Sequence, residues 1–373
     1  MRILFPVGSL FPSQAGGPAN TIYWLSKGLN TKGISTILIS STAGIQKGSV
    51  KVNKWLDTDY GKVIYCSRYF HYFPFRLIWH AFKKLSSVDI VHVNALFYPP
   101  SWIIAFAAKL YGRPVVWSVR GELHSSALFY SNYKKIPLLY FVKWLSNKGV
   151  HFHTTSTEEL INVKAFFSQG TPVFMLQNYM VLPEKIDLPT DNYLLYIGRI
   201  HPIKGLENIL AGLGGSDRFM NSCNLFLIAG EGEEDYLNRL KLLIKELQLE
   251  SKVSFLGKVT GDQKQILYAK AKATLLLSHS ENFGNVVVES LAQGTPVIAS
   301  TGTPWQLLNE TSAGYWISNS IKSISITIND LLSKSPADYQ QFRTNSLQLA
   351  KGSFDIYENI EKWSMLYKNI IKN

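Results

Sequence analysis

The chain has 373 residues, of which 46% are hydrophobic and 17% charged, and its formal net charge is +12. One hydrophobic core rarely serves so long a chain, so we expect two globular domains. No apolar run approaches the roughly eighteen residues that span a bilayer, which excludes a transmembrane helix.

The first half of the chain alternates β-branched apolar runs with helical patterns. Pro6 and Gly8 interrupt the first run, so the N-terminus is predicted to be a buried strand and not a signal peptide. Helical patterns cover residues 18–31 and 101–111. The strands are predicted at 3–7, 36–40, 89–93, 115–119, 150–154 and 173–176. Such alternation is typical of a parallel, doubly wound sheet.

A polar segment with two prolines, residues 181–191, is the best candidate for a linker. After it the alternation restarts, with strands predicted at 193–197, 224–229, 253–256, 273–277 and 296–299 and helices at 233–247, 262–270, 284–293 and 337–349. An amphipathic helix is expected at 354–371. The predicted architecture is therefore α/β, with a first domain at 1–182, a second at 192–350, and a C-terminal helix at 351–373 that crosses back to the first domain.

The positive charge is concentrated in the first half of the chain. Residues 1–190 hold 20 Lys/Arg and 8 Asp/Glu, whereas residues 191–373 hold 18 of each. Residues 69–84 and 129–144 mix aromatic and basic side chains, which favours an anionic lipid surface over nucleic acid as the partner. The alternative is two helices that face the core and extend their lysines to solvent. Only two cysteines occur, without metal-ligand spacing, so we expect a cytoplasmic protein.

The strongest motif is Ser-His-Ser-Glu-Asn-Phe-Gly-Asn at residues 278–285, followed by Glu289 and a Gly-Thr-Pro turn at 294–296. If a helix begins near Gly284, Glu281 lies in the loop before it and Glu289 lies one to two turns inside. The two carboxylates then contact different parts of a long ligand, unlike the pair that flanks one bond in a glycosidase. Free N–H groups at the helix start suit sugar hydroxyls or phosphate oxygens.

A second cluster follows the strand predicted at 193–197. Arg199 and Lys204 lie five residues apart there, and both can reach a diphosphate. Cations fixed at a leaving diphosphate stabilise the transition state more than the ground state. Near the N-terminus, Gly16 and Gly17 link a strand to a helix and permit close approach of a phosphate. This loop lacks the Gly-x-Gly-x-x-Gly dinucleotide fingerprint, which argues against NAD.

Together these elements resemble the retaining glycosyltransferases of family 4, which have the GT-B architecture of two Rossmann-like domains that face an interdomain cleft. The Glu-x7-Glu motif matches at Glu281 and Glu289, and the Gly-Arg…Lys motif matches at Arg199 and Lys204. The resemblance implies that Glu281 holds donor-sugar hydroxyls, that Glu289 binds the nucleotide ribose, and that Arg199 and Lys204 grip the diphosphate. It also implies that no metal or other cofactor is needed. Asp57-Thr58-Asp59 has the spacing of a metal motif but is expected to be a loop.

One position departs from the common family pattern, because Arg120-Gly121 follows the strand where many members place a histidine. Arg120 is expected to face a phosphate or to be structural, and His124 is a second candidate for the missing role. The expected catalytic residues are Arg199, Lys204 and Glu281. The expected substrate-binding residues are Gly16, Gly17, Arg120, Asn282, Phe283, Gly284, Asn285 and Glu289.

The sequence therefore predicts a transferase that moves a sugar from a nucleotide diphosphate, with a UDP-sugar favoured over GDP-mannose, to a glycan acceptor. The basic, aromatic first half suggests a polyprenyl-diphosphate-linked acceptor for a bacterial surface polysaccharide and a peripheral location on the inner face of the plasma membrane. Two alternatives stay open. One is a nucleotide-sugar 2-epimerase of the same layout, and the other is a relative that binds sugars without catalysis.

Overall fold

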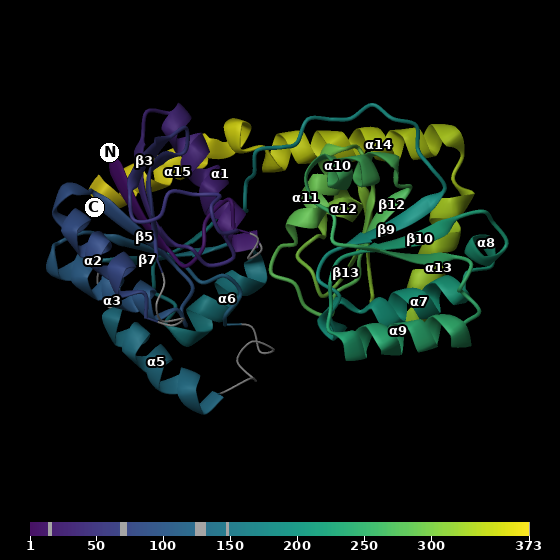
Figure 1. Ribbon diagram of the computed structural model, residues 1–373, viewed down its shortest axis with the longest axis horizontal. Helices are drawn as coiled ribbons and strands as arrows, with labels where there is room; N and C mark the ends of the chain where they lie inside the picture. The colour runs from purple at the N-terminus through teal and green to yellow at the C-terminus, as the bar shows by residue number, and fades with distance from the viewer. Residues whose placement is uncertain (14–16, 68–72, 124–131, 147–148, 373) are drawn as a thin grey trace. The chain divides into compact units, whose positions relative to one another are not determined.

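The computed structural model describes residues 1–13, 17–67, 73–123, 132–146 and 149–372, and of residues 18 and 132–136 it describes the backbone alone. The chain divides into two compact units (Figure 1). Unit 1 comprises Met1–Val181 with Asp355–Asn373, and unit 2 comprises Leu182–Phe354.

Unit 1 contains an eight-stranded sheet in the order β3-β4-β2-β1-β5-β6-β7-β8. Its strands are β1 (Arg2–Val7), β2 (Ser35–Ser41), β3 (Trp55–Thr58), β4 (Gly61–Cys66), β5 (Ile90–Asn94), β6 (Val115–Ser118), β7 (Val150–Thr154) and β8 (Val173–Met175). Its helices are α1 (Gly17–Thr31), α2 (Phe75–Lys84), α3 (Pro99–Leu110), α5 (Asn132–Leu145), α6 (Thr157–Phe166) and α15 (Ile356–Lys372). All neighbouring strands are parallel except β3 and β4, which are antiparallel.

Helices cover both faces of this sheet, which explains why its strands are apolar at consecutive positions. One core cluster includes Leu4 with side chains of α2, α3, α5 and α6. The other includes the adjacent Ile3 and Phe5 with side chains of α1 and α15. The C-terminal helix thus belongs to the core of unit 1, where Ile356 and Ile360 pack against Gly28.

Unit 2 contains a parallel six-stranded sheet in the order β11-β10-β9-β12-β13-β14. Its strands are β9 (Tyr193–Ile197), β10 (Leu225–Ala229), β11 (Val253–Gly257), β12 (Ala273–Leu276), β13 (Val297–Ser300) and β14 (Gly314–Ile317). Its helices are α7 (Leu206–Gly214), α8 (Asp217–Met220), α9 (Glu234–Glu246), α10 (Gly261–Lys270), α11 (Asn285–Ala292), α12 (Leu307–Glu310), α13 (Ile321–Ser333) and α14 (Pro336–Leu349). Helices α7, α9 and α13 pack on one core cluster, and α10 packs on the other face.

Two parallel α/β sheets confirm the predicted fold class. Three strands were not predicted, namely β3, β4 and β14. The expectation of a loop at Asp57-Thr58-Asp59 was wrong in part, because Asp57 and Thr58 lie in β3. Two of the four residues of β3 are apolar and none is fully buried, so its pairing with β4 at the sheet edge supplies the missing stabilisation. Within the described ranges, no helix has the length and apolar character needed to cross a membrane.

Candidate active site

The basic cluster lies in a tight turn at the carboxyl end of β9. Lys204 ends a short 3₁₀ turn that starts with Pro202, and the side chain of His201 caps it by accepting from the N–H of Ile203 at 3.2 Å. Gly205 closes the turn with φ +66°, and a Cβ there would lie 2.5 Å from the carbonyl oxygen of Leu277. Only glycine therefore lets this turn lie against the residues that follow β12.

The carboxylate motif forms the loop between β12 and α11. The N–H of Glu281 donates to the carbonyl of Gly302 at 3.0 Å. A Cβ on Gly302 would lie 2.4 Å from the carbonyl oxygen of His279, so the two loops are in close contact. Gly284, with φ +80°, is the N-cap of α11. Glu281 is thus in the loop before the helix and Glu289 is inside it.

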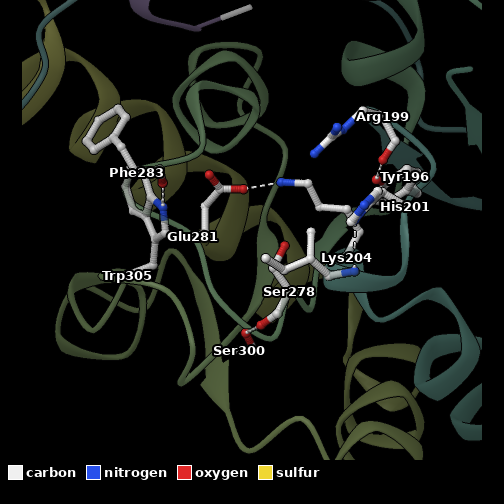
Figure 2. Close-up of polar contacts among 10 residues, drawn as sticks. Tyr196, Arg199, His201, Lys204, Ser278, Glu281, Phe283, Ser300 and Trp305 are labelled. Carbon is white, nitrogen blue, oxygen red and sulfur yellow. Dashed lines mark hydrogen bonds and ion pairs between the residues drawn. The ribbon is translucent and has the colours of Figure 1, made fainter. Parts of the chain in front are cut away.

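These two loops bring Lys204 and Glu281 into an ion pair (Figure 2), with Nζ of the lysine bonded to Oε2 of the glutamate. The side chains are only 17% and 20% exposed. A backbone bond of 2.8 Å from the N–H of His279 to the carbonyl of Ile203 holds the loops together. A cation and a carboxylate that are 77 residues apart in the chain therefore form one polar centre.

Arg199 and Glu281 both act electrostatically on the hydroxyl of Tyr196. Its guanidinium is exposed and extends toward Lys204 and Glu281 in Figure 2, while its carbonyl accepts from the hydroxyl of Tyr196 at 2.7 Å. Burial raises the pKa of Tyr196, the Glu281 carboxylate raises it further, and the Arg199 cation opposes both. The tyrosine thus experiences the charges of both residues.

Several buried polar atoms in this region have no hydrogen-bond partner in the described part of the chain. They are Oγ of Ser278, Oδ1 of Asn282 and Oδ1 of Asn319. Buried polar groups are normally paired, because an unpaired one costs about 1–3 kcal/mol. Ser278 and Asn282 belong to the loop that carries Glu281, and the amide of Asn319 donates to the carbonyl of Leu277 in the same segment at 2.6 Å. Ser278 belongs to the predicted motif but was given no role there, and Asn319 was not predicted, since an isolated asparagine in the sequence gives no signal.

The start of α11 adds donors to the same region. No backbone hydrogen bond from the N–H groups of Phe283, Gly284 or Asn285 is present among the described residues. These groups lie at the positive end of the helix dipole, where oxygen ligands are favoured. The ring of Phe283 itself is buried, and its carbonyl accepts from Nε1 of Trp305. Trp305 is itself buried and supports the loop.

Glu289 is held by two residues of α10. Its Oε2 is 2.5 Å from Nζ of Lys264 and accepts from the hydroxyl of Tyr268 at 3.0 Å. Burial and the carboxylate raise the pKa of Tyr268 well above its ordinary value, so this phenol remains a donor. Both contacts engage Oε2, which leaves Oε1 to accept from a ligand. The i, i+4 spacing of Lys264 and Tyr268 puts both on one helix face, but nothing in the sequence identifies Glu289 as their shared partner.

Arg120 lies in unit 1, in a turn with φ +57° after β6. Its Nε and Nη2 donate to Oδ1 of Asn94 at 3.1 and 2.8 Å, and its Nη1 donates to Oδ1 of Asn178 at 2.9 Å. Burial lowers its pKa to about 10, so it is still a cation at neutral pH. Neutral amides fix its orientation, while the nearby Glu159 carboxylate favours its charged form and partly opposes the effect of burial.

Two carboxylates hold the turn that carries Arg120. Glu159 accepts from the N–H groups of Gly121 and Thr155, at 2.5 and 2.6 Å, and Glu122 accepts from the N–H of Phe97 at 3.0 Å. The turn is therefore pinned to the loops after β5 and β7. Of the remaining predicted positions, Gly17 is the first residue of α1, whereas Gly16 and His124 lie outside the described residues.

Two histidines of unit 1 form a buried chain of hydrogen bonds. His153 Nε2 lies 2.8 Å from the carbonyl oxygen of Leu176, which can only accept, so Nε2 carries the hydrogen. Ser118 then donates to His153 Nδ1, His92 Nε2 donates to Ser118, and Tyr367 donates to His92 Nδ1, at 2.8, 2.7 and 2.6 Å. Burial lowers the pKa of His153 to about 3 and that of His92 well below its ordinary value. Both rings are thus neutral packing groups.

Two family comparisons cover most of the chain. Residues 182–348 match the family described as Glycosyl transferases group 1, and residues 15–178 match Glycosyltransferase Family 4. The chain belongs to glycosyltransferase family 4. The predicted family is thereby confirmed.

Among curated relatives, this family 4 chain is similar to the O-antigen chain mannosyltransferase RfbU of Salmonella typhimurium. The two are 36% identical over 110 residues, which is 30% of each protein. The chain thus spans about a third of the length of that relative.

Among solved structures, it is similar to Anabaena Alr3699/HepE in complex with UDP and glucose. The TM-score is 0.77, the identity is 17%, and the match covers 99% of this chain and 100% of that one. WaaG, a glycosyltransferase involved in lipopolysaccharide biosynthesis, gives a TM-score of 0.66 at 14% identity and covers 98% and 99%. These neighbours confirm the GT-B fold.

Proposed function

We propose that this family 4 chain is a retaining, metal-independent hexosyltransferase that moves a sugar from a nucleotide diphosphate to a glycan acceptor. The observation that carries the proposal is the Lys204–Glu281 ion pair at the carboxyl ends of β9 and β12, with Arg199 directed toward it. In a nucleotide sugar, the anomeric carbon is bonded to a diphosphate oxygen. A cation for the diphosphate and a carboxylate for sugar hydroxyls must therefore lie side by side.

The proposed step occurs on one face of the sugar. The bond between the anomeric carbon and the diphosphate oxygen breaks, and the acceptor hydroxyl oxygen bonds to the same face, which retains the configuration. A diphosphate oxygen takes the hydroxyl proton. Arg199 and Lys204 stabilise the negative charge that grows on the diphosphate, and Glu281 orients the sugar without forming a covalent bond to it.

Glu289 is assigned to the nucleotide ribose, through the Oε1 that Lys264 and Tyr268 leave free. The N–H groups of Phe283, Gly284 and Asn285 and the side chain of Asn282 are assigned to the sugar and the diphosphate. Gly16 and Gly17 are assigned to the approach of the substrate in unit 1. No metal ligand set is invoked, because two cations already face the diphosphate.

A UDP-sugar is the favoured donor and GDP-mannose the second candidate. The HepE neighbour was solved with UDP and glucose, whereas the RfbU relative is a mannosyltransferase by name. Thermal-shift screening of UDP-, GDP- and ADP-sugars identifies the donor, since the ligand that binds the native state raises the melting temperature.

Turnover of that donor with a bacterial membrane extract tests the proposed activity, and NMR of the product reads the anomeric configuration. We expect Glu281→Gln to lower kcat by about 10²–10³ while calorimetry still detects the donor. A Glu281→Gln enzyme that keeps most of its kcat contradicts the assignment, and an inverted product contradicts the mechanism.

Two other activities of this architecture give different results in the same experiment. A 2-epimerase changes the sugar of the donor in the absence of any acceptor. A binding protein shows donor binding by calorimetry but no turnover with any extract. A 2-epimerase also needs an acid and a base on opposite faces of the sugar ring, and no such pair is assigned among the described residues, which favours the transferase.

For the acceptor we propose a polyprenyl-diphosphate-linked glycan of a bacterial surface polysaccharide, with the enzyme peripheral on the inner face of the plasma membrane. An aromatic surface on α2, α3 and α5 of unit 1 supports this. On α2, Trp79 is 51% exposed and Lys83 lies 3.6 Å from its ring centroid. Phe106 of α3 stacks on Trp144 of α5, which is 60% exposed. Exposed rings beside lysines are typical of a surface that lies at lipid headgroups.

The Arg120 cation is the proposed contact for the acceptor phosphate.

Flotation with anionic and neutral liposomes at low salt tests the membrane assignment. We expect the protein to float with anionic liposomes, and Trp79→Ser with Trp144→Ser to weaken that binding. Leu242→Ser in α9 is the matched control, since Leu242 is 62% exposed but lies in unit 2. Equal binding by the tryptophan variant, or no binding by the native protein, overturns the assignment.

A further inference from the structure

Unit 2 contains a cavity of about 340 Å³ that is remote from the Lys204–Glu281 pair. Thr190, Asn192 and Lys272 line one side of it. Asn192 and Lys272 immediately precede strands β9 and β12, and Thr190 lies three residues before β9. The other side comes from the end of α13 and from α14. Because the strands are parallel, the cavity lies at the amino ends of the strands whose carboxyl ends carry the candidate active site.

The charged side chains that line this cavity, among the described residues, are all basic. Among the described residues that line it, Lys272, Lys334 and Arg343 are cations and none is a carboxylate. Residues 191–373 as a whole carry 18 basic and 18 acidic side chains, so this is a local excess. Lys334 is paired with Asp330 at 3.3 Å. No carboxylate partner of Lys272 occurs in the described part of the chain.

Arg343 supplies an independent sign of a missing ligand. Its Nη2 donates to the carbonyl oxygens of Ala269 and Gln293, each at 3.3 Å. Its Nη1 is buried and has no hydrogen-bond partner among the described residues. A buried guanidinium N–H without an acceptor is costly, and an anionic oxygen is the partner that satisfies it best.

We propose that this cavity binds a small phosphomonoester, with the phosphate between Arg343 and Lys272. A phosphomonoester carries a charge of about −1.5 to −2 at neutral pH, which suits two cations without a carboxylate partner among the described residues better than a single carboxylate does. The volume lies at the lower end of the roughly 300–1,000 Å³ of small-molecule sites. Leu331 and Leu332 provide an apolar wall for the organic part of the ligand. The hydroxyl of Tyr339, which also lines the cavity, donates to the carbonyl of Lys272 at 2.8 Å. This site is independent of the proposed transferase chemistry.

Calorimetry on the full chain tests the proposal with glucose 1-phosphate as the probe, and with inorganic phosphate and glucose as the two separate arms. We expect glucose 1-phosphate to bind, inorganic phosphate to bind more weakly because it lacks the part that meets the apolar wall, and glucose not to bind. Lys272→Met should weaken the binding by at least about tenfold, the loss of one charge-assisted hydrogen bond. Arg343→Lys should also weaken it.

Lys204→Met is the control that separates this cavity from the candidate active site. If the probe binds at the cavity, Lys204→Met leaves the binding within about twofold of the native value. The proposal is overturned if Lys204→Met abolishes all binding, if Lys272→Met binds as the native chain does, or if glucose binds as well as its phosphate. Because Arg343 also holds two carbonyl groups, melting temperatures are compared first. Lys272→Met alone then decides the outcome if Arg343→Lys unfolds.

Discussion

Replacing Lys204 and Glu281 singly and together should give the coupling energy of the ion pair, which neither single substitution can isolate. The perturbations are Lys204→Met, Glu281→Gln and the double variant. At an effective dielectric constant of 20, two unit charges 4 Å apart interact by about 4 kcal/mol. Both side chains are about one-fifth exposed, and exposed pairs contribute less than about 1 kcal/mol. We therefore expect a coupling energy of about 1–2 kcal/mol in the free energy of unfolding.

Urea unfolding of the four proteins gives this coupling energy, and kcat at saturating donor gives its counterpart in catalysis. Each single variant should lose about 10²–10³ in kcat. The double variant should lose about tenfold less than the product of the two losses, because the second change removes a charge that the first leaves unpaired. The matched control is Lys258 with Glu231 in the same unit, which are 50% and 71% exposed and 3.9 Å apart. Its coupling should be below about 1 kcal/mol.

Two results would contradict this expectation. Losses that simply multiply in the double variant show that the working enzyme does not hold the pair. A native kcat in Lys204→Met shows that the cation does not act on the leaving diphosphate.

Three further outcomes are expected. Lys264→Met should raise the donor KM about tenfold and leave kcat unchanged. The reason is that Glu289 loses a partner that orients it equally for the ground state and the transition state. A fall in kcat at constant KM contradicts this prediction. Below pH 6.5, His153 should lower the free energy of unfolding by up to about 1.4 kcal/mol per pH unit. Its pKa is about 3 in the native state, so only the unfolded chain takes up the proton in this range. Urea unfolding of His153→Gln should therefore depend less steeply on pH, and an unchanged slope contradicts the assignment. Gly205→Ala should lower the free energy of unfolding by about 1–2 kcal/mol because of its left-handed backbone. The contact of the new Cβ with a backbone carbonyl should lower it by about 1–3 kcal/mol more. Gly261 is also left-handed but has no atom within 4 Å of its added Cβ, so Gly261→Ala should show only the first effect, and equal melting temperatures of the two variants rule the contact out.

The start of α11 shows what local sequence can predict. Gly284 and the apolar run that follows it indicate a helix N-terminus, and this alone puts Glu281 in a loop and Glu289 inside a helix. Alternating strands and helices likewise predict two doubly wound units, because the spacing of apolar residues within a short window indicates each element. The edge strand β3 gives no such pattern, since pairing with β4 and not burial stabilises it.

The partners of the charged groups could not be read in the same way. Lys204 meets Glu281 only because β9 and β12 are neighbours in the sheet, which places the loops after them at one edge. Glu289 is held by Lys264 of α10, and the order of strands and helices decided that pairing as well.

Local sequence predicts most of the helices and strands and the side chains available for chemistry, because each depends on residues within a few turns of one another. The packing of the elements sets which cation faces which carboxylate and which polar atoms stay unpaired. Those distances depend on strand order and not on separation along the chain.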